Sequence, residues 1–175
     1  MMTKQENSLQ LLSEMIKNAN DGKSLFTNWR QLLGFQIGWL EPTLAERFCL
    51  ENDLDTSNCE IIMMQATGRT ECHAHQVGST VFMALGSVHG FRDPQGGTLF
   101  GDYLPGEKTF SLKPERASSG EMFTVEPGKI HAFFADSGGE LTAIGIVSPK
   151  IMKGEDEFDA IKFKFINDDT VKLSA

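Results

Sequence analysis

Apolar and polar residues alternate in short runs along most of the chain, from about residue 35 to residue 165. Such alternation is typical of β-strands that bury one face and expose the other. Residues 59–66 are instead apolar at nearly every position, which predicts a central strand covered on both faces. Further strands are expected at residues 35–39, 48–50, 79–85, 87–91, 98–103, 122–125, 130–134 and 141–147. Turn signals separate these runs, so the pattern predicts an all-β barrel or jelly roll.

Near the N-terminus the apolar residues recur with a different period. Apolar residues recur at helical spacing at positions 9, 12, 15, 16 and 19, and Asn7 with Gln10 resembles a capping box. We therefore expect one amphipathic helix over residues 7–19 that packs on the outside of the barrel or on a partner subunit.

The C-terminal end also changes character. Residues 154–159 form an acidic run that should be solvated, and residues 161–165 alternate between apolar residues and lysines, which is typical of an edge strand. The polar residues 112–120 are expected to form the longest loop. We divide the chain into a helical arm at residues 1–30, a single barrel at residues 31–150 and a C-terminal extension at residues 151–175.

Composition narrows the kind of partner. The 175-residue chain carries a formal net charge of −8, which argues against nucleic acid or an anionic membrane surface as the main partner. The first residues lack the apolar segment of a signal peptide, and no apolar run is long enough to span a membrane, so we expect a cytoplasmic protein. The chain has three cysteines, Cys49, Cys59 and Cys72. Because their number is odd and their spacing shows no pairing, we expect no disulfide.

Three of the four histidines point to metal chemistry. His73 and His75 lie two residues apart in a segment that reads as a strand, so their side chains share one face about 7 Å apart along the strand. Two imidazoles from one strand need further ligands to hold a transition metal. His131 follows the turn signal Pro127-Gly128 and begins a short apolar strand, which makes it the natural third ligand.

The arrangement of these histidines and glycines resembles the two signature motifs of the cupins, a superfamily of small β-barrels. The residues that carry the resemblance are Gly68, His73, His75 and Gly86 in the first motif and Gly120, Pro127, Gly128 and His131 in the second. The resemblance implies a cupin-like double-stranded β-helix. The glutamate of the first motif, usually the fourth ligand, would fall on Ser79 or Thr80, and the final asparagine of the second motif is Ala135.

Without that glutamate, the resemblance implies a three-histidine site similar to those of cysteine dioxygenases and diketone-cleaving dioxygenases, which typically use Fe(II). Three imidazoles also accept Ni, Mn, Co, Cu or Zn. The leading hypothesis is a metal-dependent dioxygenase that acts on a small molecule. The alternatives are a non-catalytic small-molecule binding or sensing barrel and a metal-dependent isomerase or lyase.

Several further residues are candidates near the metal. Glu71 has the same parity as His73, so a regular strand would direct its carboxylate inward as a ligand or general base, although an exposed charge explains it equally well. Gln76, Ser79 and Thr80 could act through water behind the ligands, or simply serve turn chemistry. His89 is expected on a strand as an ordinary barrel histidine, with a role as a ligand or an acid–base group near the metal as the alternative. Exposed sheet edges favour a homodimer.

Overall fold

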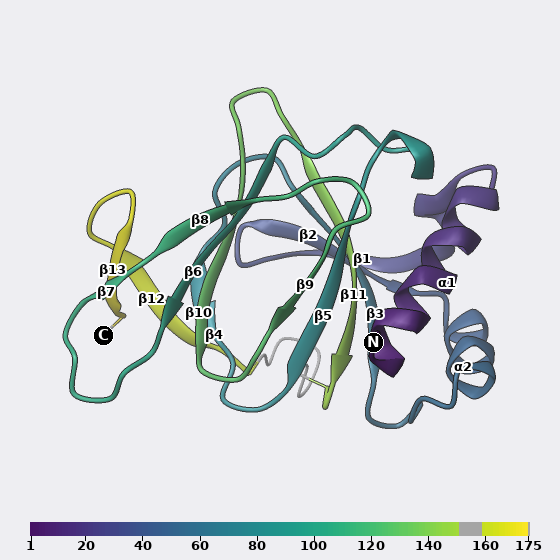
Figure 1. Ribbon diagram of the computed structural model, residues 1–175, viewed down its shortest axis with the longest axis horizontal. Coiled ribbons are helices and arrows are strands. Elements are labelled where there is room, and N and C mark those ends of the chain that lie inside the picture. The colour runs from purple at the N-terminus through teal and green to yellow at the C-terminus, as the bar shows by residue number, and fades with distance from the viewer. Residues whose placement is uncertain (151–158, 175) are drawn as a thin grey trace.

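The computed structural model describes residues 1–150 and 159–174, and it shows two curved antiparallel sheets that face each other as a barrel (Figure 1). Sheet A consists, in spatial order, of β1 (Phe26–Leu32), β2 (Phe35–Leu40), β3 (Glu60–Ala66), β11 (Leu141–Ser148), β5 (Ser79–Leu85) and β9 (Met122–Val125). Sheet B consists of β7 (Phe110–Ser111), β13 (Thr170–Leu173), β12 (Ile161–Phe165), β4 (Cys72–Ala74), β10 (Lys129–Ala135), β6 (Gly96–Asp102) and β8 (Lys113–Arg116). The predicted fold class, an all-β barrel with an N-terminal helix, is confirmed.

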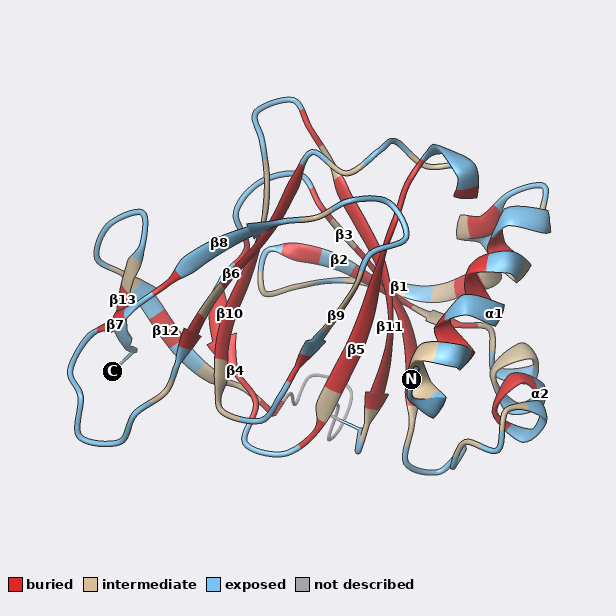
Figure 2. Cartoon of the chain, in the orientation of Figure 1, coloured by how far each residue is buried: buried red, intermediate tan, exposed pale blue. Residues whose placement is uncertain are grey.

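Buried residues, coloured red in Figure 2, form three apolar clusters that hold these layers together. The first lies between sheet A and the helices, and the second lies between the two sheets, where Phe82 of β5 meets Phe133 of β10. The third is built from sheet B and the segments beside it. Strand β3 contributes to the first two clusters from its opposite faces, which confirms the prediction of a central strand buried on both sides.

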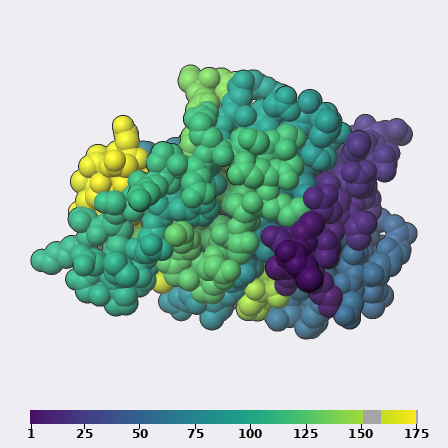
Figure 3. All heavy atoms as spheres, viewed as in Figure 1, coloured from purple at the N-terminus to yellow at the C-terminus, as the bar shows by residue number. Residues whose placement is uncertain are grey.

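The N-terminal helix α1 (Lys4–Asn18) begins three residues earlier than expected. Its capping box is made by Thr3 and Glu6: the Thr3 hydroxyl accepts the Glu6 N–H at 3.2 Å, and the Glu6 carboxylate accepts the Thr3 N–H at 2.6 Å. Leu9, Leu12 and Ile16 are buried against the outer face of sheet A. Figure 3 shows α1 on the surface at one end of the molecule and the C-terminal strands at the opposite end.

The strand predicted at residues 48–50 is wrong, because residues 42–51 form the helix α2 (Pro42–Glu51). Pro42 occupies the first turn of this helix, where its missing N–H costs nothing, and the Glu41 carboxylate caps the Leu44 N–H at 3.0 Å. Phe48 is buried while Leu50 is 71% exposed, so their alternation reflects two sides of a helix.

Two other expected elements differ. The strand predicted at residues 87–91 is a 3₁₀ turn, η2 (Ser87–His89), which ends at Gly90 in the left-handed region at φ 85°. The long loop predicted at residues 112–120 contains the edge strand β8, whose four residues are all exposed and therefore show no alternation. A further 3₁₀ turn, η1 (Gly22–Leu25), joins α1 to β1.

The C-terminal segment is more central than expected. The edge-strand prediction for residues 161–165 is wrong, because β12 pairs with β4 on one side and with β13 on the other. Residues 154–158 of the predicted acidic run lie outside the described residues, and Asp159 is buried rather than solvated. The proposed boundary between residues 30 and 31 falls inside β1. Among the described residues, no helix is long and apolar enough to cross a membrane.

Candidate metal centre

The three predicted ligands meet in the barrel interior. His73 lies in β4, His75 directly follows β4, and His131 of β10 sits opposite His73 in the strand register. Their ring centroids are 4.2 Å apart for His73 and His131, 4.9 Å for His73 and His75, and 5.2 Å for His75 and His131. All three are buried, and their ligating atoms lie within 4.8 Å of one another. This cluster is suited to a divalent metal ion.

Backbone carbonyls fix the tautomer of each ring. The Nδ1 of His131 lies 2.9 Å from the Lys129 carbonyl, the Nδ1 of His73 lies 3.3 Å from the Glu71 carbonyl, and the Nδ1 of His75 bonds the Asp159 carbonyl. A carbonyl oxygen can only accept a hydrogen bond, so each Nδ1 carries the proton. Each Nε2 therefore keeps its lone pair, as a metal-binding imidazole requires.

Burial keeps the three rings neutral. It lowers the pKa of His131 to about 3, with a further contribution from His75. Burial also lowers the pKa of His73 well below its usual range, helped by His131 and His75, and lowers that of His75. The three rings are therefore neutral at pH 7, the protonation state in which an imidazole binds a metal.

Asp159 is a site residue that the sequence reading missed. Besides its carbonyl at His75, its carboxylate accepts the N–H of Gln76 at 3.3 Å and that of Val77 at 3.0 Å. Gln76 thus takes part through its backbone, while its side chain is exposed. Its position in the sequence could have indicated this role. Asp159 ends the acidic run two residues before the predicted strand at 161–165, where a carboxylate can point into the barrel.

Glu60 is a second missed residue. It is 8% exposed at the start of β3, and its carboxylate accepts the Trp39 indole N–H at 3.2 Å. This carboxylate is close enough to His75 to oppose the lowering of that pKa. Glu60, Val147 and Thr80 form a row across β3, β11 and β5, and all three are buried. A carboxylate in an otherwise apolar strand was the available signal.

Three other candidates differ in their surroundings. Thr80 is buried in the row just described, whereas Ser79 is half-buried and lines a hollow at the end of β5 together with Thr3. His89 lies in η2 next to α1, and its Nδ1 accepts the Gly86 N–H at 3.2 Å. It is outside the three-histidine group.

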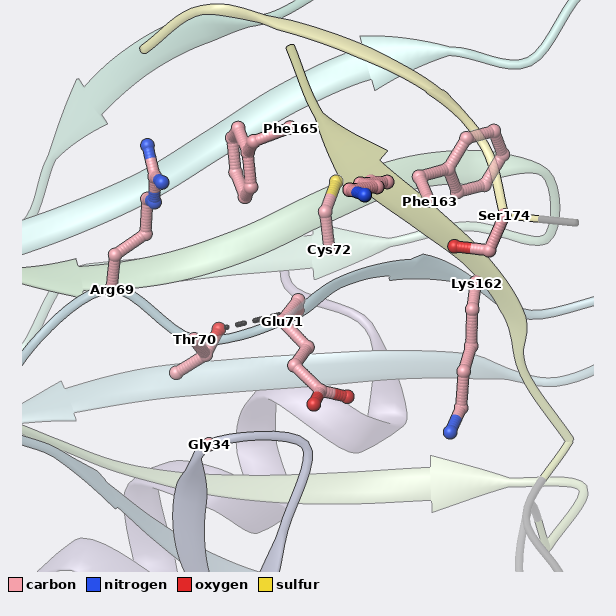
Figure 4. Close-up of a pocket in the computed structure, with 10 residues that line it drawn as sticks. Gly34, Arg69, Thr70, Glu71, Cys72, Lys162, Phe163, Phe165 and Ser174 are labelled. Carbon is pink, nitrogen blue, oxygen red and sulfur yellow. Dashed lines mark hydrogen bonds between the residues drawn. The ribbon is translucent and has the colours of Figure 1, made fainter. Parts of the chain in front are cut away.

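Glu71 is exposed, because the regular strand begins only at Cys72 and the inward alternation does not extend to it. Its side chain lines an outer pocket of about 430 Å³, where Figure 4 shows it and Lys162 directed to the same side. What reaches the histidines is its carbonyl oxygen. Cys72 is buried, and burial raises the pKa of its thiol to about 12, in keeping with a packing role.

No protein-family model matches the chain, and neither does any curated protein. Among solved structures, the capsular polysaccharide assembling protein CapF from Staphylococcus aureus is similar with a TM-score of 0.51 and 9% identity over 77% of this chain and 31% of that chain. Streptomyces Pac13, described as a unique nucleoside dehydratase, gives 0.46 and 15% over 82% and 89%. KdgF from Halomonas sp. gives 0.43 and 17% over 72% and 94%. At these identities the likeness is one of fold alone.

Proposed function

We propose that this protein is a metal-dependent enzyme that acts on a small molecule, with His73, His75 and His131 as the ligands of a divalent transition metal. The observation that carries the proposal is the buried cluster of the three rings, whose candidate ligand atoms all lie within 4.8 Å of one another. Each Nδ1 donates to a backbone carbonyl, which leaves Nε2 as the ring nitrogen with a lone pair. An imidazole whose other N–H is held by a carbonyl in this way is typical of metal-binding histidines.

Fe(II) and a dioxygenase reaction are the leading assignment. Three neutral imidazoles leave the ion its full charge and leave coordination positions open for O₂ and an anionic bidentate substrate such as an enolate or thiolate. The glutamate of the cupin motif would fall on Ser79 or Thr80, neither of which is a carboxylate, and this supports the resemblance to three-histidine dioxygenases. Ni, Mn, Co, Cu and Zn are alternative metals for the same donors.

A second candidate, a metal-dependent lyase or isomerase, is favoured by Glu60. Such reactions need a general acid or base beside the metal-bound substrate. The Glu60 carboxylate is buried, held by the Trp39 indole N–H, and near enough to influence His75. Glu71 stays a weaker proposal for this role, because its carboxylate is exposed on the outer pocket.

Elemental analysis of protein purified without chelator or nickel affinity resin tests the proposal. We expect about one equivalent of metal, lost in His73→Ala, and iron together with O₂ uptake on small enols or thiols would support the dioxygenase. A stoichiometric metal without O₂ uptake would support the lyase or isomerase. For that reaction we expect the rate of substrate turnover to fall about 100-fold in Glu60→Gln and less than twofold in Glu71→Gln. Metal content indifferent to His73 would overturn the three-histidine site and favour a non-catalytic binding barrel.

The dimer, the cytoplasmic location and the absence of nucleic-acid or membrane partners stay predictions. A homodimer would be detected by light scattering of the purified protein. The small-molecule partner rests on the buried position of the three histidines inside a barrel.

A further inference from the structure

The strand that carries two of the three histidines is short and depends on its neighbours. β4 spans only Cys72–Ala74, and it is held between β10 and β12. His73 lies within it, and His75 lies just beyond its end, where the His75 carbonyl still accepts the Gly128 N–H at 2.8 Å. That bond fixes one point of the backbone but does not set the direction of the His75 ring.

Asp159 makes further contacts that hold this segment. Its carboxylate accepts two consecutive N–H groups, from Gln76 at 3.3 Å and from Val77 at 3.0 Å, directly after His75. Its carbonyl oxygen accepts the His75 Nδ1–H. One residue thus fixes both the backbone that follows the ligand and the orientation of the ligand ring.

The burial of Asp159 supports a dedicated role. The residue is 4% exposed, and a buried carboxylate is stable only when it is hydrogen-bonded or paired. It is also the residue from which the chain enters β12, which pairs with β4 through Ile161 and Ala74 and through Lys162 and His73. The C-terminal segment and the ligand strand are therefore coupled at two adjacent places.

We infer that Asp159 is a positioning residue for the metal centre, which ties the C-terminal segment to His75 and sets the tautomer and direction of that ring. The inference rests on the proposed function for its effect on metal, while its effect on His75 stands without it. Groups that orient metal-binding histidines typically change metal affinity by about 10- to 100-fold when they are removed. Docking of residues 159–165 and metal binding should consequently favour each other.

The test compares Asp159→Asn and Asp159→Ala with the wild type. Asn can still accept one of the two N–H groups, whereas Ala can accept neither, and both remove the same charge. The Nδ1 proton of His75 is followed by NMR in metal-free protein, and the dissociation constant for Co(II) is measured by titration. Asp93→Ala is the matched control. The Asp93 carboxylate also accepts a backbone N–H, that of Ser87 at 2.8 Å, but this bond lies at η2 and not at the three histidines.

We expect the His75 Nδ1 proton to exchange at least about 10-fold faster in Asp159→Ala, and Co(II) affinity to fall about 10- to 100-fold, with Asp159→Asn between it and the wild type. Asp93→Ala should change neither quantity. Should Asp159→Ala not fold, Asp159→Asn carries the same comparison.

The two proposals fail separately. An unchanged His75 proton and an unchanged Co(II) affinity in a folded Asp159 variant would overturn the positioning role and leave the metal centre standing. Failure of the wild type to bind Co(II), combined with faster His75 exchange in the variant, would support the positioning role and overturn the metal centre.

Discussion

Two regions of the molecule bury histidines in opposite ways. In the barrel, His73, His75 and His131 donate their Nδ1–H groups to backbone carbonyls and keep the Nε2 lone pair. Beside α1, His89 does the reverse, because its Nδ1 accepts the Gly86 N–H. In both regions burial is the main cause of a lowered pKa.

The difference teaches that burial and a shifted pKa do not by themselves identify a site. His89 is 8% exposed and has a lowered pKa, yet its Nδ1 lone pair is used to cap a 3₁₀ turn. The barrel histidines differ in two respects, the direction of the Nδ1 hydrogen bond and the presence of two other rings within about 5 Å. A metal ion can bind rings whose Nδ1 donates and whose Nε2 keeps its lone pair. The 3₁₀ turn instead uses a ring whose Nδ1 accepts a backbone N–H.

The largest expected effect separates the two regions by metal-dependent stability. At a free metal concentration of 1,000 times the dissociation constant, binding to the folded state adds about 4 kcal/mol to the free energy of unfolding. For a chain of this size that raises the melting temperature by about 8–16 °C. We expect His131→Ala to lose this rise, His89→Ala to keep it, and a chelator to reverse it in both the wild type and His89→Ala. Equal loss in His89→Ala would place the metal elsewhere.

A second, intermediate effect concerns the pH dependence of metal affinity. Protons compete with a metal only below the pKa of each ring, and burial holds the pKa of His131 at about 3 and those of His73 and His75 below the usual range. Three ordinary imidazoles with a pKa near 6.5 would together lose about 1,000-fold in affinity at pH 5.5. We expect a loss of less than about 10-fold between pH 7.5 and 5.5.

Co(II) titrations at the two pH values measure this loss directly. A decrease near 1,000-fold would mean that the three rings protonate as exposed histidines do. His89 serves here as the internal reference, since its replacement by Ala should leave the affinity unchanged at both pH values.

Much of this arrangement was predictable from the sequence, because it rests on local spacing. The two-residue spacing of His73 and His75 predicted that both side chains lie on the same face of a strand. The turn signal before His131 predicted that this third histidine lies near the start of another strand. The alternation of apolar and polar residues indicated the barrel. The run of residues 59–66, which is apolar at nearly every position, indicated the central strand β3. Each of these inferences uses residues that are neighbours along the chain, so the backbone period decides the outcome.

Some of the parts that failed depend on contacts between distant segments. Asp159 reaches Gln76 across 83 residues of sequence, and β12 is an interior strand because it pairs with both β4 and β13. Phe48 and Leu50 read as a strand because apolar residues at i and i+2 fit the strand period, and that prediction overlooked the local helix signals at Glu41 and Pro42. The positions of Asp159 and β12, by contrast, are set by tertiary packing and leave little local trace.

The smallest expected effect comes from His89 itself. The pKa of this residue is lowered by burial and by Lys17, and partly restored by Glu14 of α1. Below pH 6.5 the unfolded chain therefore binds more protons at this position than the folded protein, so the free energy of unfolding falls as the pH falls. His89→Gln cannot be protonated and can still accept the Gly86 N–H. Between pH 7.5 and 5.0 its melting temperature in metal-free protein should fall less than that of the wild type, by no more than about 2 °C. Calorimetry at the two pH values measures the difference, and a steeper fall in the variant would contradict the assigned role of His89 as a neutral acceptor.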